Sequence, residues 1–194
     1  MNLVLIGISG AGKGTQADML AKQYSLNHIS TGELFRQEYE AKSPEGIAAY
    51  NYWSKGNWVP DRVTFALLKL HLDRVQNGFV LDGFPRTLAQ SQILDDYLSQ
   101  KNQKVDFVIY LKVSEEEAIE RLQNRAKLDE RDKGKSREDE TEEIIKKRFM
   151  SFQQSIAPVL DFYQKHGVLK EVNGERSIEE IFTNIVNIVE KNNL

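Results

Sequence analysis

The sequence contains no cysteine, only four prolines and no long hydrophobic run, and each absence excludes a class of protein. Without cysteine there can be no disulfide framework, no thiol nucleophile and no zinc site built on cysteine ligands. No segment reaches the roughly 18 consecutive apolar residues that a membrane span needs. Residues 1–6 carry no basic flank, so we expect no secretory signal peptide. These features predict a cytoplasmic protein without a membrane partner.

A surplus of basic residues is also missing. The 26 lysines and arginines are outnumbered by 29 aspartates and glutamates, which gives a net charge of −3. Proteins that bind nucleic-acid duplexes normally carry a basic excess, so we expect no nucleic-acid partner. A chain of 194 residues with 40% hydrophobic residues can bury one core of its own. No apolar stripe demands a partner, so we expect a monomer.

Short apolar runs alternate with helical patterns along the chain. The runs expected to be strands are residues 3–6, 79–81, 107–111 and 168–172, with a weaker candidate at 26–29. Continuous apolar runs of this length are typical of parallel strands covered on both faces. Helical spacing of apolar residues occupies 15–24 and 62–75, and capping-box patterns begin at Ser114 and Ser177. The alternation predicts a three-layer α/β/α fold around a five-stranded parallel sheet.

Two stretches interrupt this alternation. Residues 30–59 have helical composition broken by Pro44, Gly46 and Gly56, so we expect a small helical insertion. Residues 125–148 are mostly charged, which predicts a solvated loop that leads into a charged helix. No linker rich in proline or serine is present, so both stretches are expected to be excursions from a single domain.

Residues 7–15, Gly-Ile-Ser-Gly-Ala-Gly-Lys-Gly-Thr, predict a phosphate-binding loop (P-loop). The segment follows the first expected strand and opens the first expected helix, which is the context that such a loop requires. Its glycines let backbone N–H groups turn toward phosphate oxygens, and the helix N-terminus adds partial positive charge. The alternative is a glycine-rich turn without a ligand. The residues expected to hold the phosphates are Gly10, Ala11, Gly12, Lys13, Gly14 and Thr15.

A second candidate functional residue is acidic and lies at the end of the strand expected near residue 80. Phe-Val-Leu-Asp at 79–82 is an apolar strand that ends in a carboxylate, a pattern typical of residues that orient water around Mg²⁺. The alternative is an aspartate that caps a helix or a turn. We therefore expect Mg²⁺, held through water near Thr15 and Asp82, as the cofactor that accompanies ATP, and we expect no zinc.

Several motifs in order along the whole chain resemble those of nucleoside monophosphate kinases, and of adenylate kinases in particular. They are Gly-Lys-Gly-Thr-Gln at 12–16, His-Ile-Ser-Thr-Gly-Glu-Leu-Phe-Arg at 28–36, Leu-Asp-Gly-Phe-Pro-Arg-Thr at 81–87 followed by Gln90, and arginines at 121, 125, 137 and 148. The resemblance implies reversible, Mg²⁺-dependent phosphoryl transfer from ATP to AMP, which gives two ADP. It also implies a core of residues 1–29, 60–124 and 138–194, an insertion at 30–59 that binds the nucleoside monophosphate (NMP), and a short lid at 125–137.

The resemblance assigns residues to each nucleotide. Besides the P-loop, the ATP site is expected to contain Arg121, Arg125 and Arg176. The AMP site is expected to contain Thr31, Arg36, Asn57, Trp58, Val59, Gly83, Phe84, Pro85, Arg86, Gln90, Arg137 and Arg148. The expected catalytic residues are Lys13, Arg86, Arg125, Arg137 and Arg148, because cations stabilise the charge on a phosphoryl group in flight. An ionised acceptor phosphate needs no general base.

Departures from the family pattern leave the acceptor base open. Thr31 and Gln90 favour AMP, whereas Trp58 stands where the family usually has leucine, and Ser9 replaces the usual proline of the P-loop. One alternative is therefore a kinase for UMP or CMP. Another is a P-loop ATPase that regulates a partner, although such a protein would have no use for an acceptor site.

Overall fold

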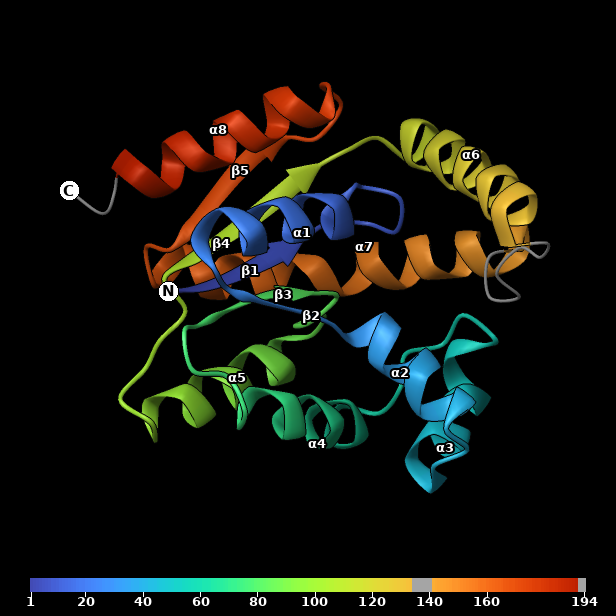
Figure 1. Ribbon diagram of the computed structural model, residues 1–194, viewed down its shortest axis with the longest axis horizontal. Coiled ribbons are helices and arrows are strands. Elements are labelled where there is room, and N and C mark those ends of the chain that lie inside the picture. The colour runs from blue at the N-terminus through green and yellow to red at the C-terminus, as the bar shows by residue number, and fades with distance from the viewer. Residues whose placement is uncertain (134–140, 192–194) are drawn as a thin grey trace.

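Five parallel strands form the central sheet of the computed structural model, which describes residues 1–133 and 141–191 (Figure 1). They are β1 (Asn2–Ile6), β2 (Asn27–Ser30), β3 (Phe79–Asp82), β4 (Phe107–Lys112) and β5 (Leu169–Asn173), in the spatial order β2-β3-β1-β4-β5. Each expected strand is present within one or two residues of its predicted position. The prediction of a five-stranded parallel sheet is confirmed.

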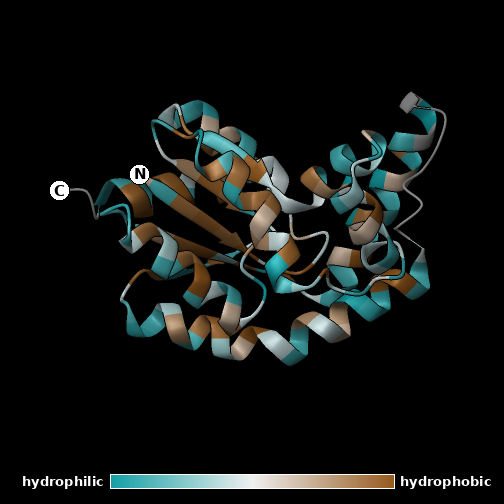
Figure 2. Cartoon of the chain, turned by 90° about the horizontal axis from the view of Figure 1, so that it is seen from below, coloured by the Kyte–Doolittle hydropathy of each residue, from teal (hydrophilic) through white to brown (hydrophobic). Residues whose placement is uncertain are grey.

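Helices cover both faces of this sheet and complete the three layers. One face packs against α1 (Lys13–Tyr24) and α8 (Ile178–Lys191), and the other against α4 (Asp61–Leu72), α5 (Leu88–Ser99) and α7 (Glu142–Lys165). Alternate residues of β1 point to opposite faces, so Leu3 and Leu5 join the first core while Val4 and Ile6 join the second. Figure 2 shows the hydrophobic strands enclosed by helices with many hydrophilic outer residues.

The other helices lie beyond the carboxyl edge of the sheet. Helices α2 (Thr31–Glu40) and α3 (Pro44–Trp53) form the predicted helical insertion (Figure 1). Helix α6 (Glu115–Lys133) runs through residues 125–133, where the charge pattern predicts a loop, so that prediction is wrong. Residues 126–133 are rich in alanine, leucine, lysine, arginine and glutamate, which are strong helix formers even without an apolar face. Arg137 and the end of the expected lid lie outside the described residues.

An acidic residue links α4 to α5 on the surface. Asp73 follows α4 directly and accepts hydrogen bonds from Lys69 and Lys101, both with Nζ at 2.6 Å, and from the Tyr97 hydroxyl at 2.7 Å. These three donors lower the pKa of Asp73 far below its ordinary value, with Lys101 making the largest contribution.

Among the residues that the structure describes, no helix has the length and apolar composition needed to cross a bilayer.

Strand register brings three chain segments to one level. In the pairing of β1 with β3, Leu5 lies opposite Asp82, and in the pairing of β2 with β3, Ser30 lies opposite the same residue. The P-loop after β1, the start of α2 after β2 and the turn after β3 therefore leave the sheet side by side at its carboxyl edge. In open α/β sheets this edge is where ligands bind.

Candidate active site

A cavity of about 800 Å³ opens at the carboxyl edge of the sheet. The predicted site residues that line it are Gly10, Ala11, Gly12, Lys13, Gly14, Thr15, Thr31, Arg36, Asn57, Trp58, Val59, Asp82, Gly83, Arg86, Gln90, Arg121, Arg125, Arg148 and Arg176. Phe84 is different: its ring is fully buried in the core beside Phe65, so it supports the turn from behind. Pro85 borders a small adjoining cavity of about 30 Å³.

The P-loop has the backbone that its glycines predict. Gly10 and Gly12 have φ angles of +87° and +85°, which side chains with a Cβ rarely adopt. A Cβ on Gly10 would lie 2.4 Å from the carbonyl oxygen of Ala118 in α6, so the loop packs closely against that helix. Lys13 is the first residue of α1, and no acidic residue stands in the first turn. The loop therefore presents a helix N-terminus suited to an anion.

Lys13 is held inside the loop that precedes it. Its Nζ donates hydrogen bonds of 2.9 Å each to the carbonyl oxygens of Gly7 and Ile8. Removal from solvent lowers the pKa of Lys13 from 10.5 to about 8; Asp82 opposes this shift, while three neighbouring arginines add to it. A lysine in such a cationic setting gains favourable interactions when phosphate arrives.

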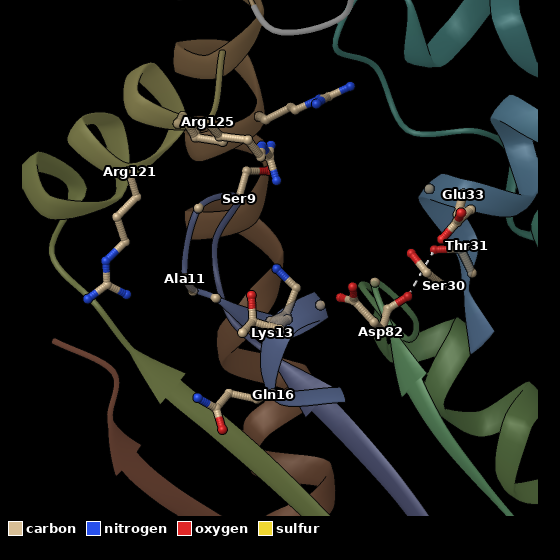
Figure 3. A pocket seen from close by; sticks show the side chains of 18 of the residues that line it. Ser9, Ala11, Lys13, Gln16, Ser30, Thr31, Glu33, Asp82, Arg121 and Arg125 are labelled. Carbon is tan, nitrogen blue, oxygen red and sulfur yellow. Dashed lines mark hydrogen bonds between the residues drawn. The ribbon is translucent and has the colours of Figure 1, made fainter. Parts of the chain in front are cut away.

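The Asp82 carboxylate faces Lys13 across the floor of the cavity (Figure 3). One of its oxygens lies 3.5 Å from the place where a Cβ on Gly14 would stand, so the start of α1 and the end of β3 approach closely. Carboxylate oxygen beside a phosphate loop is the kind of ligand that Mg²⁺ prefers, shared with substrate phosphates. The residues present therefore fit a magnesium ion.

The three arginines that lower the pKa of Lys13 line the cavity, one from the loop after β3 and two from helices α6 and α7. Arg86 follows the turn after β3, and its Nε donates to the carbonyl oxygen of Gly83 at 2.7 Å. Arg148 reaches from α7 and donates through Nη2 to the carbonyl oxygen of Trp53 at 3.3 Å. Arg125 projects from α6 toward the P-loop, above Lys13 (Figure 3). Burial first, and then the charge of Arg148, lowers the pKa of Arg86 from its ordinary value to about 10.

The half of the cavity between the insertion and α5 has an aromatic wall and fixed polar groups. The Arg86 guanidinium lies over the Trp58 ring, with its Cζ 6.0 Å from the ring centroid. Gly83, at φ +83°, leaves room for Thr31, whose Oγ1 would stand 2.8 Å from a Cβ there. Gln90 is 2% exposed, and its Oε1 accepts the Arg86 backbone N–H at 2.7 Å.

The opposite half of the cavity lies between the P-loop, α6 and the loop that precedes α8. Arg121 donates to Glu117 at 2.7 Å and to the carbonyl oxygen of Gly174 at 2.8 Å, which ties α6 to that loop. Gln16 donates through Nε2 to the carbonyl oxygen of Ile178 at 3.0 Å. Arg121 and Gln16 thus anchor the loop that carries Arg176 from two sides.

Sequence motifs did not identify every residue of the cavity. Trp53 lines it from the end of α3 and packs edge-on against Tyr50, with ring centroids 5.1 Å apart. It belongs to no recognised motif, and only the helical spacing of aromatic residues in the insertion could have indicated it. His28, the first residue of the motif at 28–36, also lines the cavity, although no role was assigned to it, and its Nδ1 pairs with Asp18 at 2.7 Å.

This architecture defines a P-loop phosphotransferase: a phosphate cradle and its lysine face a second polar half across a cluster of arginines. Comparisons with known proteins agree. A family model described as adenylate kinase matches residues 5–168. The chain belongs to the adenylate kinase family and is a nucleoside monophosphate kinase.

Individual relatives match over nearly their whole length. An adenylate kinase of Thermobifida fusca (strain YX) is 41% identical over 183 aligned positions, covering 93% of this chain and 94% of the relative. One from Clostridium botulinum (strain Loch Maree / Type A3) is 39% identical over 212 positions, covering 97% and 98%. One from Bacillus subtilis (strain 168) is 35% identical over 212 positions with the same coverage.

Proposed function

We propose that the cavity holds ATP and AMP head to head, so that a phosphoryl group passes from ATP to AMP, the reaction of the adenylate kinase family. The P-loop half binds ATP, with Arg121 and Arg176 beside its base and Arg125 beside its phosphates. The half lined by Thr31, Trp58 and Gln90 binds AMP. The observation that carries the proposal is that both halves converge on the same cations, Lys13 among them.

The chemistry follows from these positions. An ionised oxygen of the AMP phosphate attacks the γ-phosphorus of ATP in line, and the bond from that phosphorus to the bridging oxygen of ADP breaks. Lys13, Arg86, Arg125 and Arg148 stabilise the charge spread over the transferred group, and one such arginine can contribute about 10³–10⁵ in rate. We assign Arg137 to the same set from the sequence alone. Mg²⁺, when bound near Thr15 and Asp82, neutralises the phosphates of ATP.

The insertion and the lid exclude water in this proposal. Residues 30–59 cover AMP and residues 125–137 cover ATP, because water that reached the γ-phosphate would turn the transferase into an ATPase.

The acceptor is AMP in preference to UMP or CMP. Gln90 supports this choice, because an amide offers the donor and the acceptor that an adenine edge requires, and it lines the cavity beside Thr31. We also propose that the chain acts as a monomer in the cytoplasm, without nucleic-acid or membrane partners. Its acidic net charge and lack of cysteine support that setting.

A coupled assay that measures ADP formed from ATP with AMP, CMP, UMP or GMP in turn tests the proposal. We expect fast turnover with AMP and slow turnover with the other three. Arg86→Ala should lower kcat/KM by about 10³-fold or more, whereas Arg74→Ala, an exposed arginine outside the cavity, should not. Consumption of ATP at the same rate with and without any monophosphate would contradict the proposed reaction.

A further inference from the structure

Asp61 is the first residue of α4, and both of its carboxylate oxygens are engaged by residues next to the cavity. Oδ1 accepts a hydrogen bond of 2.7 Å from Nε2 of Gln90, and Oδ2 accepts one of 3.1 Å from the Thr87 hydroxyl. Gln90 lines the cavity, whereas Asp61 is absent from its wall. Asp61 therefore acts on the cavity only through its neighbours.

Gln90 is held at both ends of its amide. Its Oε1 accepts the backbone N–H of Arg86 at 2.7 Å, while its Nε2 donates to Asp61. A carboxylate accepts hydrogen bonds and a backbone N–H donates them, so the amide group cannot exchange its oxygen and nitrogen without losing both bonds. The Thr87 hydroxyl completes the arrangement, because it accepts the backbone N–H of Gln90 at 3.1 Å.

Fixed polarity at this position separates two bases of the same shape. Each end of the Gln90 amide can form one further hydrogen bond: Oε1 has a second lone pair that can accept, and Nε2 has a second hydrogen that it can donate. Adenine presents a donor at N6 beside an acceptor at N1. Hypoxanthine presents an acceptor at O6 beside a donor at N1, which is the reverse order, so one orientation of the amide can satisfy only one of them.

We propose that Asp61 is a positioning residue that locks the Gln90 amide in the orientation that selects adenine over 6-oxopurines in the acceptor site. This inference rests on the proposed function, because it assumes that the Gln90 half of the cavity binds AMP. Asp61 itself touches neither nucleotide. Its loss leaves the bond from the Arg86 backbone N–H as the one side-chain contact named here that still opposes the reversed orientation, so the reversed amide becomes less costly.

The test compares kcat/KM for AMP and for inosine monophosphate (IMP) in the full-length protein. We expect Asp61→Ala to lower the AMP-to-IMP ratio by about 10- to 100-fold, the range that one bidentate base contact provides. The KM for ATP should stay within about twofold, because the donor half is untouched. Glu116→Ala is the matched control, since it removes an exposed acidic residue from the first turn of α6 instead of α4.

A double-mutant cycle distinguishes positioning from general destabilisation. In a Gln90→Ala background, Asp61→Ala should cause no further loss of selectivity, because the residue through which it acts is gone. If Asp61→Ala fails to fold, Asp61→Leu carries the same comparison, because leucine has a similar branched shape and cannot accept the hydrogen bond from Gln90.

An AMP-to-IMP ratio that survives loss of Asp61, or falls as far again in the Gln90→Ala background, would overturn the inference. Failure of the wild-type protein to phosphorylate AMP would instead contradict the proposed function.

Discussion

Replacement of Lys13 by methionine should change how the stability of the protein depends on pH. In the folded protein the pKa of this lysine is about 8, against 10.5 for an ordinary lysine. Below pH 8 the side chain is charged in both the folded and the unfolded state, and the folded state bears the full cost of the enclosed charge. Between pH 8 and 10.5 the unfolded chain binds the extra proton, so this group makes the wild type more stable as pH rises.

The magnitude follows from the two pKa values. One pH unit corresponds to about 1.4 kcal/mol per proton. Between pH 7 and pH 10, the free energy of unfolding of the wild type should therefore rise by about 2.5 kcal/mol relative to that of Lys13→Met. The hydrogen bonds from Nζ to the carbonyls of Gly7 and Ile8 add an offset to the difference between the two proteins. That offset does not alter the slope, because a neutral amine also donates.

Urea unfolding of nucleotide-free protein at several pH values measures this slope. Lys22→Met, an exposed lysine in the last turn of the same helix, gives the baseline for a lysine-to-methionine exchange. Curves for Lys13→Met and Lys22→Met that run parallel from pH 7 to 10 would refute the argument that Lys13 is held in a buried, cationic environment. Turnover by Lys13→Met should fall by orders of magnitude at every pH.

Three other perturbations have equally definite outcomes. Gly10→Ala should lower the free energy of unfolding by about 2 kcal/mol in urea titrations, because the added methyl group would clash with the backbone of α6 and because alanine rarely adopts the positive φ of this residue. Unchanged stability would contradict that packing. Asp73→Asn should lower the melting temperature at pH 7, with a deficit that shrinks on acidification, since a depressed carboxyl pKa contributes stability that is lost as pH falls. AMP should change the emission of Trp53 and Trp58, the chain's two tryptophans, and Trp58→Phe should remove part of that signal; an emission insensitive to AMP would place the nucleotide elsewhere.

The features that could be predicted from the sequence are those that depend on residues next to one another in the chain. The P-loop, the strand that ends in Asp82 and the turn that leads to Arg86 each combine an element boundary with a chemical group, so local order alone indicates their role. The parallel sheet follows from the same alternation of apolar runs and helical segments. Such motifs also contain scaffold, however: Phe84 stands inside one, yet it packs in the core.

Residues that act through tertiary contacts were missed for a physical reason. Asp61 meets Gln90 across 29 positions of the chain, and Trp53 reaches the cavity only because α3 packs against α2 and α4. Neither spacing is fixed by a local rule. The helical state of residues 125–133 was missed because charge density indicated solvation, and a solvated segment of strong helix formers can still be helical.

Helix α6 carries two cavity arginines, Arg121 and Arg125, one turn apart on the same face. A single residue inserted between them would swing the second guanidinium by about 100° around the helix axis and leave it facing bulk solvent. The three residues between Arg121 and Arg125 therefore fix the angle between the two guanidinium groups through their number. An insertion past Arg125 would instead leave the spacing of both charges unchanged.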